Sequence, residues 1–166
     1  TVVAVTNRAG QLNATCGTPA AFTNTSARIS GITNVTNGVT DQCVVVNAVA
    51  PTLTKGWSTS TINDGANTNL IFTLTNSGTN PAQSGIAFTE SLPTGLRFNG
   101  AAPTVTFANG CSGTSVVTQG VTDTIAFSTV AIPNTVASCT ITVVAVTNRA
   151  GQLNATCGTP AAFTNT

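Results

Sequence analysis

The segment NLIFTLT, residues 69–75, decides the fold class. Leu70, Phe72 and Leu74 fall on one side of an extended chain, and mostly polar residues lie between them. A period of two is typical of a half-buried β-strand, and β-branched threonine favours extended backbone on the solvent face. The segment therefore predicts a strand with one face in a core.

The same alternation recurs along the chain. It is carried by Ile86 and Phe88, Val105 and Phe107, Ile125 and Phe127, and Cys139, Ile141 and Val143. Pairs such as Asn109-Gly110 separate these runs, because asparagine and glycine accept the positive φ of tight turns. Short strands separated by turns predict an all-β, immunoglobulin-like antiparallel β-sandwich.

The chain contains a long internal repeat. Residues 1–25 recur letter for letter at 142–166, an offset of 141 residues. This period is too long for a solenoid unit and suits a whole β-domain. Two explanations stay open: a tandem array of nearly identical domains, which we favour, or separate subunits whose equivalent ends exchange strands.

The expected domain boundary lies near Pro51. The apolar run Cys43–Val46 reads as the last strand of one repeat, and residues 52–57 open the next. On this division, 1–50 holds the C-terminal strands of one repeat. Residues 51–166 hold the N-terminal and middle strands of the next, which an adjoining copy completes. The linker between them, at Ala48–Pro51, is only about three residues long. So short a linker restricts the angle between neighbouring domains.

Composition excludes several functions. Only 5% of the residues are charged and there is no histidine, so imidazole-based catalysis and metal binding are excluded. Five cations cannot form the basic surface that nucleic acid or an anionic membrane requires. No apolar run reaches the roughly 20 residues that span a bilayer. We therefore expect no enzyme, no cofactor, no nucleic-acid partner and no membrane insertion.

The cysteines indicate a disulfide framework. Cys157 duplicates Cys16, which leaves Cys16, Cys43, Cys111 and Cys139 in one period. Four cysteines allow three pairings, and sequence alone does not select one. Their spacing favours Cys16–Cys43 and Cys111–Cys139, each worth about 3–4 kcal/mol. Disulfides indicate an extracellular or cell-surface location, and Cys157 would stay free or pair in a neighbouring copy.

Three other features suggest chemistry. Lys55 and Glu90, with a nearby asparagine, would suit an isopeptide crosslink, although an exposed pair is the simpler interpretation. Trp57 is the only tryptophan, and we expect it to pack against the preceding domain rather than to stack on a sugar. N-glycosylation sequons begin at Asn13, Asn24, Asn34 and Asn154.

Several runs resemble a known family when taken together. They are PTLTK (51–55), STI (60–62), LIFTLTN (70–76), IAFTESLPTGL (86–96), SCTITV (138–143) and FTNT (22–25). They are similar to the bacterial surface-repeat family catalogued as domain of unknown function number eleven. The resemblance implies tandem immunoglobulin-like β-sandwiches in large exported proteins, with structural or adhesive roles. The extra Cys16 and Cys43 depart from that pattern.

These observations predict a structural repeat unit of an extracellular filament, stalk or giant cell-surface protein. Its partners would be adjoining copies of itself, and disulfides, short linkers or strand exchange would make it rigid. The alternative is an adhesin module that binds glycan or host protein through loops such as 31–41 or 108–115.

Overall fold

The computed structural model describes residues 5–8, 11–12, 15–16, 22–77, 80–154 and 163. These residues form ten β-strands and one short 3-10 helix, which confirms the all-β class. No helix in this part of the chain has the length and hydropathy needed to cross a membrane.

The strands fall into a small N-terminal pair and a larger two-sheet domain. The N-terminal part holds β1 (Thr23–Asn24), the 3-10 helix η2 (Ser26–Arg28) and β2 (Gln42–Cys43). The two-sheet domain holds β3 (Thr52–Trp57), β4 (Thr68–Thr75), β5 (Gln83–Ser91), β6 (Leu96–Phe98), β7 (Val105–Ala108), β8 (Ser112–Thr118), β9 (Thr124–Ile132) and β10 (Ser138–Asn148).

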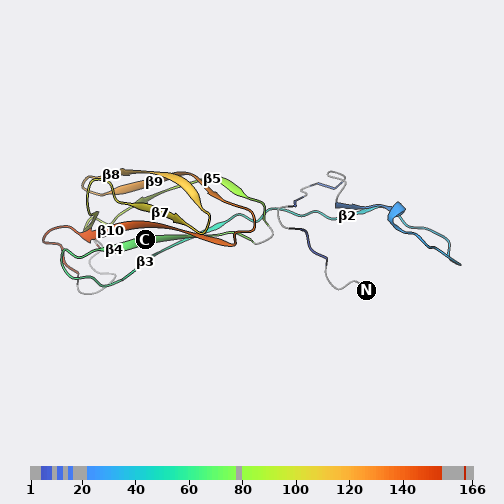
Figure 1. Cartoon of the computed structure of the whole chain (residues 1–166), viewed down its shortest axis with the longest axis horizontal. Coiled ribbons are helices and arrows are strands. Elements are labelled where there is room, and N and C mark those ends of the chain that lie inside the picture. The colour runs from blue at the N-terminus through green and yellow to red at the C-terminus, as the bar shows by residue number, and fades with distance from the viewer. Residues whose placement is uncertain are drawn as a thin grey trace.

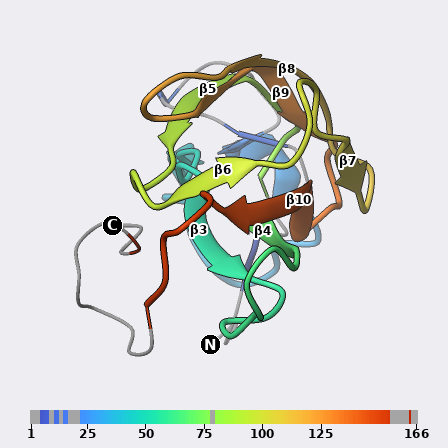
Figure 2. The same cartoon turned by 90° about the vertical axis from the view of Figure 1, so that its left-hand side faces the viewer.

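The two large sheets pack face to face (Figures 1 and 2). One has the order β3-β4-β10, with β6 and β7 both pairing with the far side of β10. The other has the order β5-β9-β8, and all of these pairs are antiparallel. Strand β10 therefore lies inside its sheet, flanked on both sides.

A β-bulge lets β10 serve two partners on one edge. It pairs with β7 over residues 140–143 and with β6 over residues 146–148. The register shifts between Val143 and Val146, and Ala145 adopts a φ of 65°. A bulge of this kind bends the strand and redirects its pairing.

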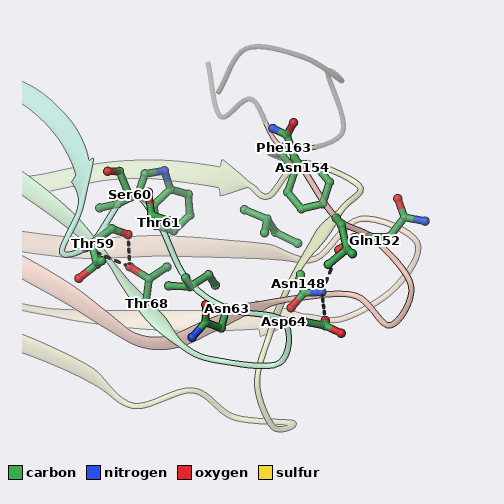
Figure 3. Close-up of a pocket in the computed structure, with 14 residues that line it drawn as sticks. Thr59, Ser60, Thr61, Asn63, Asp64, Thr68, Asn148, Gln152, Asn154 and Phe163 are labelled. Atoms are coloured by element: carbon green, nitrogen blue, oxygen red, sulfur yellow. Dashed lines mark hydrogen bonds between the residues drawn. The ribbon is translucent and has the colours of Figure 1, made fainter. Parts of the chain in front are cut away.

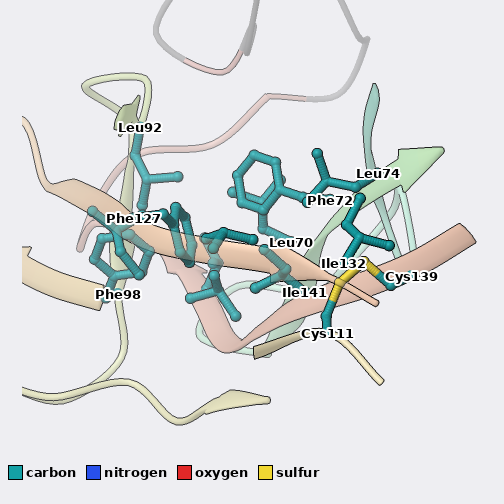
Figure 4. Packing of buried hydrophobic residues seen from close by; sticks show 14 of the residues in the cluster. Leu70, Phe72, Leu74, Leu92, Phe98, Cys111, Phe127, Ile132, Cys139 and Ile141 are labelled. Carbon is teal, nitrogen blue, oxygen red and sulfur yellow. A yellow bond between two sulfur atoms is a disulfide. The ribbon is translucent and has the colours of Figure 1, made fainter. Parts of the chain in front are cut away.

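One apolar core fills the space between the sheets (Figure 4). Leu70, Phe72 and Leu74 of β4 are buried, as the alternation predicted. The ring of Phe72 lies 5.1 Å from that of Phe88 in β5 and 5.4 Å from that of Phe127 in β9. The predicted positions in β9 and β10 are likewise buried, and those in β5 and β7 are half-buried against the core. Aromatic contacts across the sheets thus hold the two layers together.

The strand order differs from that of constant immunoglobulin domains. In those domains the fifth strand lies beside the second, and the last strand lies beside the sixth. Here the last strand, β10, lies beside the second strand of the domain, β4. The fifth, β8, lies beside β9 instead, when β6 and β7 are counted as one interrupted strand.

The segment from residue 22 to residue 50 has no buried residue and extends away from one end of the two-sheet domain (Figure 1). The strand expected over Cys43–Val46 is shorter than predicted, because β2 ends at Cys43 and Val44 and Val45 are exposed. Among the residues that the structure describes, β2 pairs with the two-residue β1. High β-propensity does not make a strand where no sheet is available to pair with.

Gly113 marks the closest approach between β8 and the core, and it yields a test of the packing. A Cβ added there would lie 2.9 Å from Cγ2 and 3.1 Å from Cα of Val130. We expect Gly113→Ala to lower the free energy of unfolding in urea by about 1–3 kcal/mol, because the neighbouring strand must shift.

Gly56→Ala in β3 is the matched control, since a Cβ there meets nothing within 4 Å. It should be neutral or stabilising by up to about 1 kcal/mol. Equal effects of the two substitutions would contradict the packing described for β8.

Candidate functional site

The carboxylates of the chain act as hydrogen-bond acceptors at four separate places. Asp41 accepts from the backbone N of Ser26 at 2.6 Å, and Asp64 accepts from the Asn148 amide. Glu90 pairs with Lys55 and Asp123 pairs with Arg149. No three potential metal ligands gather among the described residues. The predictions of no enzyme and no cofactor stay predictions.

Asp123 and Arg149 form the main polar contact of the domain. The buried Asp123 carboxylate accepts from Arg149 Nη2 at 2.8 Å and from the backbone N of Phe98 at 2.9 Å and Gly120 at 3.1 Å. Arg149 also donates to the carbonyls of Leu96 and Gly120. This network fixes the end of β10 to β6 and to the loop before β9.

A tight turn follows β10 at residues 148–152. The side-chain amide of Asn148 donates to the carbonyls of Arg149 at 3.2 Å and Gln152 at 2.8 Å. The backbone N of Gln152 donates to the Arg149 carbonyl at 2.9 Å. Asn148 also contacts Asp64 and Gly65 of the β3–β4 loop, so the turn is attached to the domain.

The first copy of the repeat makes the same hydrogen bonds as this turn. The Asn7 amide donates to the carbonyls of Arg8 at 3.3 Å and Gln11 at 2.9 Å, and Gln11 N donates to Arg8 O at 2.9 Å. Val5 is 85% exposed, whereas its twin Val146 is 0% exposed. The same hydrogen bonds thus form in two different surroundings, so they are encoded locally.

Two disulfides are present, and they are the pairings that spacing favoured. Cys111–Cys139 has a Cα–Cα distance of 5.7 Å and joins the residue before β8 to β10, across the two sheets (Figure 4). Cys16–Cys43 has a Cα–Cα distance of 5.6 Å and lies in the N-terminal segment. Cys157 lies outside the described residues. Two disulfides indicate an oxidising, extracellular environment.

Lys55 and Glu90 lie close together. Lys55 is exposed but Glu90 is only 6% exposed, so the simpler interpretation of an exposed pair is wrong for Glu90. Lys55 Nζ is 3.2 Å from Glu90 Oε2 and 3.4 Å from Oε1. The pair joins β3 and β5, the adjacent edge strands of the two sheets, above the rings of Phe72 and Phe88. No asparagine is among the residues that line this cleft. The described geometry is that of an inter-sheet ion pair, and the isopeptide stays a prediction.

Asn80 attaches the linker to the domain. Its buried side-chain amide accepts from Val49 N at 3.1 Å and donates to Val49 O and to Asn76 Oδ1, the latter at 2.7 Å. The amide therefore pairs with Val49 as a neighbouring strand would. The role of Asn80 was not predictable from the sequence, because its partner Val49 lies 31 positions away.

Trp57 lines a cavity of about 330 Å³ at the end of the domain (Figure 3). Its walls include Leu96, Leu153 and Phe163, with threonine, asparagine and glutamine side chains at the rim. Because β3 begins beside the linker and ends at Trp57, this cavity lies at the end remote from Pro51. We expected Trp57 to pack against the domain that precedes the linker. That prediction is wrong, because Trp57 lies at the other end of the two-sheet domain.

The sequon asparagines differ in accessibility. Asn24 and Asn34 are exposed in the N-terminal segment, whereas Asn154 is half-buried and lines the Trp57 cavity. Asn13 lies outside the described residues. Glycosylation of these asparagines stays a prediction.

The two copies of the repeat allow an internally controlled test of the ion pair. Arg149→Ala leaves the Asp123 carboxylate buried without its cation, which should lower the free energy of unfolding by about 3 kcal/mol. Arg8→Ala changes the same residue in the same local turn, where Arg8 is exposed, and should change stability by less than about 0.5 kcal/mol. Chemical denaturation checks both, and similar losses would contradict the proposed network.

The two disulfides should make separable contributions. Replacing Cys111 and Cys139 by serine removes the bond between the sheets and should destabilise the two-sheet domain by about 3–4 kcal/mol. Replacing Cys16 and Cys43 should leave that unfolding transition unchanged and should accelerate proteolysis between residues 22 and 42. Loss of domain stability in the second variant would show that the N-terminal segment supports the core.

Comparison with known proteins places the two-sheet domain in a family. Residues 51–165 match a family described as a domain of unknown function, DUF7933. None of the curated proteins matches the chain, and no solved structure does. Membership of the surface-repeat family number eleven stays a prediction. Because the matched region includes every strand from β3 to β10 and most of the sequence, the chain belongs to the DUF7933 family.

Proposed function

We propose that this chain is a structural repeat unit of an extracellular filament, stalk or giant cell-surface protein. Immunoglobulin-like two-sheet domains would follow one another with a period of 141 residues. The observation that carries the proposal is that the chain enters and leaves the two-sheet domain at opposite ends.

Strand pairing fixes these two ends. Thr52 at the start of β3 and Ser138 at the start of β10 both pair with Thr75 of β4. At the other end, Trp57 pairs with Leu70 and Val146 pairs with Thr68. Strands β3 and β10 therefore run in the same direction on either side of β4, and the chain passes through the domain lengthwise.

This path suits a load-bearing unit. Tension on the chain pulls the start of β3 and the end of β10 in opposite directions along the strand axis. Ladder hydrogen bonds are perpendicular to the strands, so sliding β3 or β10 past β4 must break many bonds together. The ion pair between Lys55 and Glu90 adds a link at the β3 edge.

The repeat places a connector, residues 8–50 of this chain, between successive domains. Residues that follow β10 have the same sequence as residues 8–25, which lead toward the linker of this domain. The Cys16–Cys43 bond closes this connector, and Asn80 holds its end at Val49. These two attachments support an array in which the connector has a fixed place between domains.

The alternative is an adhesin module that binds glycan or host protein through its loops. It is favoured by the exposure of every residue from 31 to 41, a segment of the connector that contributes nothing to the core. Binding by a single isolated chain would support this alternative.

Electron microscopy of the native assembly tests the proposal, together with denaturing electrophoresis of the same material. We expect uniform thin fibres built only from this chain, in which the mass of one axial repeat corresponds to 141 residues. A covalent array gives polypeptides far larger than 16.5 kDa under reducing denaturation.

Two results would count against it. Fibres that dissociate to chains of 16.5 kDa would indicate separate subunits that exchange strands, and not a covalent array. Native material without fibres, combined with glycan or protein binding by one chain, would replace the structural role by the adhesive one.

A further inference from the structure

The end of the domain around Trp57 already holds a residue of the following segment. Phe163 lines the same cavity as Trp57, and both side chains are half-buried against the core (Figure 3). Phe163 belongs to the second copy of the repeat, where its twin in the first copy is Phe22. The occupant of this surface is therefore duplicated at the start of the connector.

We propose that the Trp57 surface is a docking site between adjoining copies. It is defined here by Trp57, Leu96, Leu153 and the rim residues of their cavity. Phe163 docks on it in this chain, and in an array Phe22 docks on the Trp57 surface of the preceding copy. This inference rests on the proposed array and identifies the contact that sets its geometry.

The turn after β10 lies at this site. Asn148 and Gln152 of the turn, together with Leu153, line the cavity themselves. The same hydrogen bonds form at Asn7–Gln11, so the chain leaves both copies of the strand in the same way. Equivalent turns therefore start the path toward Phe22 and Phe163 alike.

The chemistry of the cavity suits an aromatic side chain of this segment. Trp57, Ile62, Leu96 and Leu153 supply apolar surface, and no lysine or arginine lines the walls. A phenylalanine placed there buries apolar area and leaves no polar group unpaired. An anionic ligand would find no cation among the lining residues.

Docking of Phe22 would hold the start of the connector, and the end of the connector is already held at Val49. Asn80 holds Val49, the last part of the connector, to the domain that follows it. Phe22 would hold the first part to the domain that precedes it. A connector fixed at both ends, with Cys16–Cys43 between, sets the spacing and the rotation of successive domains.

Fluorescence of Trp57, the only tryptophan of the chain, tests the contact directly. Phe163→Ala should shift the emission of Trp57 to longer wavelength and increase its quenching by acrylamide, because the indole becomes more exposed to water. The matched control is Phe22→Ala, which has the same neighbours in sequence and lies in the N-terminal segment. It should leave the emission of Trp57 unchanged.

Denaturation monitored by circular dichroism should give a lower unfolding midpoint for Phe163→Ala than for Phe22→Ala, since Phe163 packs against the core and the substitution exposes apolar surface to water. In a chain extended to two complete periods, Phe163→Ala should also widen the distribution of angles between the domains in electron micrographs. These two results together support docking between copies.

Other outcomes overturn the inference. Unchanged Trp57 emission in Phe163→Ala, or equal changes in both variants, would contradict docking at this site, even if fibres of the chain are observed. Quenching of Trp57 by neutral hexoses in Phe163→Ala, without any change in the angles between domains, would make the surface a sugar site. Absence of fibres tests the array itself and leaves the Trp57 result to be judged separately.

Discussion

The pairing of β10 on both sides is the constraint on which the rest of the structure depends. This strand lies between β4 and the two short strands β6 and β7, and its residues Cys139, Ile141 and Val143 close the core. Val146, near its end, is 0% exposed between Thr68 of β4 and Phe98 of β6. A β-strand is stabilised by cross-strand contacts far more than by its own propensity. The domain is complete only where β10 has its neighbours.

The chain has few charged residues, and each of its two described ion pairs joins particular strands. The chain has five cations and four anions, and the two ion pairs described join different strands. Asp123 and Arg149 fix the end of β10, and Lys55 and Glu90 join the edge strands. A nearly neutral surface avoids the repulsion that would accumulate if many charged copies followed one another. The polar contacts thus position strands without adding a net field.

The buried faces of strands and the tight turns were predictable, because both depend on residues that are close together in the sequence. Alternation identified the buried face of β4, β9 and β10, and Asn109-Gly110 forms the expected turn with positive φ at both residues. The order of the strands was not predictable, because nothing in β10 itself specifies that it pairs with β4. The positive φ of Ala145 and the amide of Asn80 depend on distant partners in the same way. The Trp57 cavity was missed because Phe163 lies far from Trp57 in sequence.

The position of the Cys111–Cys139 disulfide determines which part of the domain would carry tension. Cys139 pairs with Leu74 near the end of the domain where the chain enters, whereas tension acts on β10 from its far end. If β10 were pulled out of its sheet, the load would pass through the disulfide to Cys111 and not through residues 112–138. Those residues, which include β8 and β9, would be shielded. Because 28 positions separate the two cysteines, the bond withholds roughly 90–100 Å of extended chain. In the proposed array, a domain threaded lengthwise would therefore extend in short steps under load.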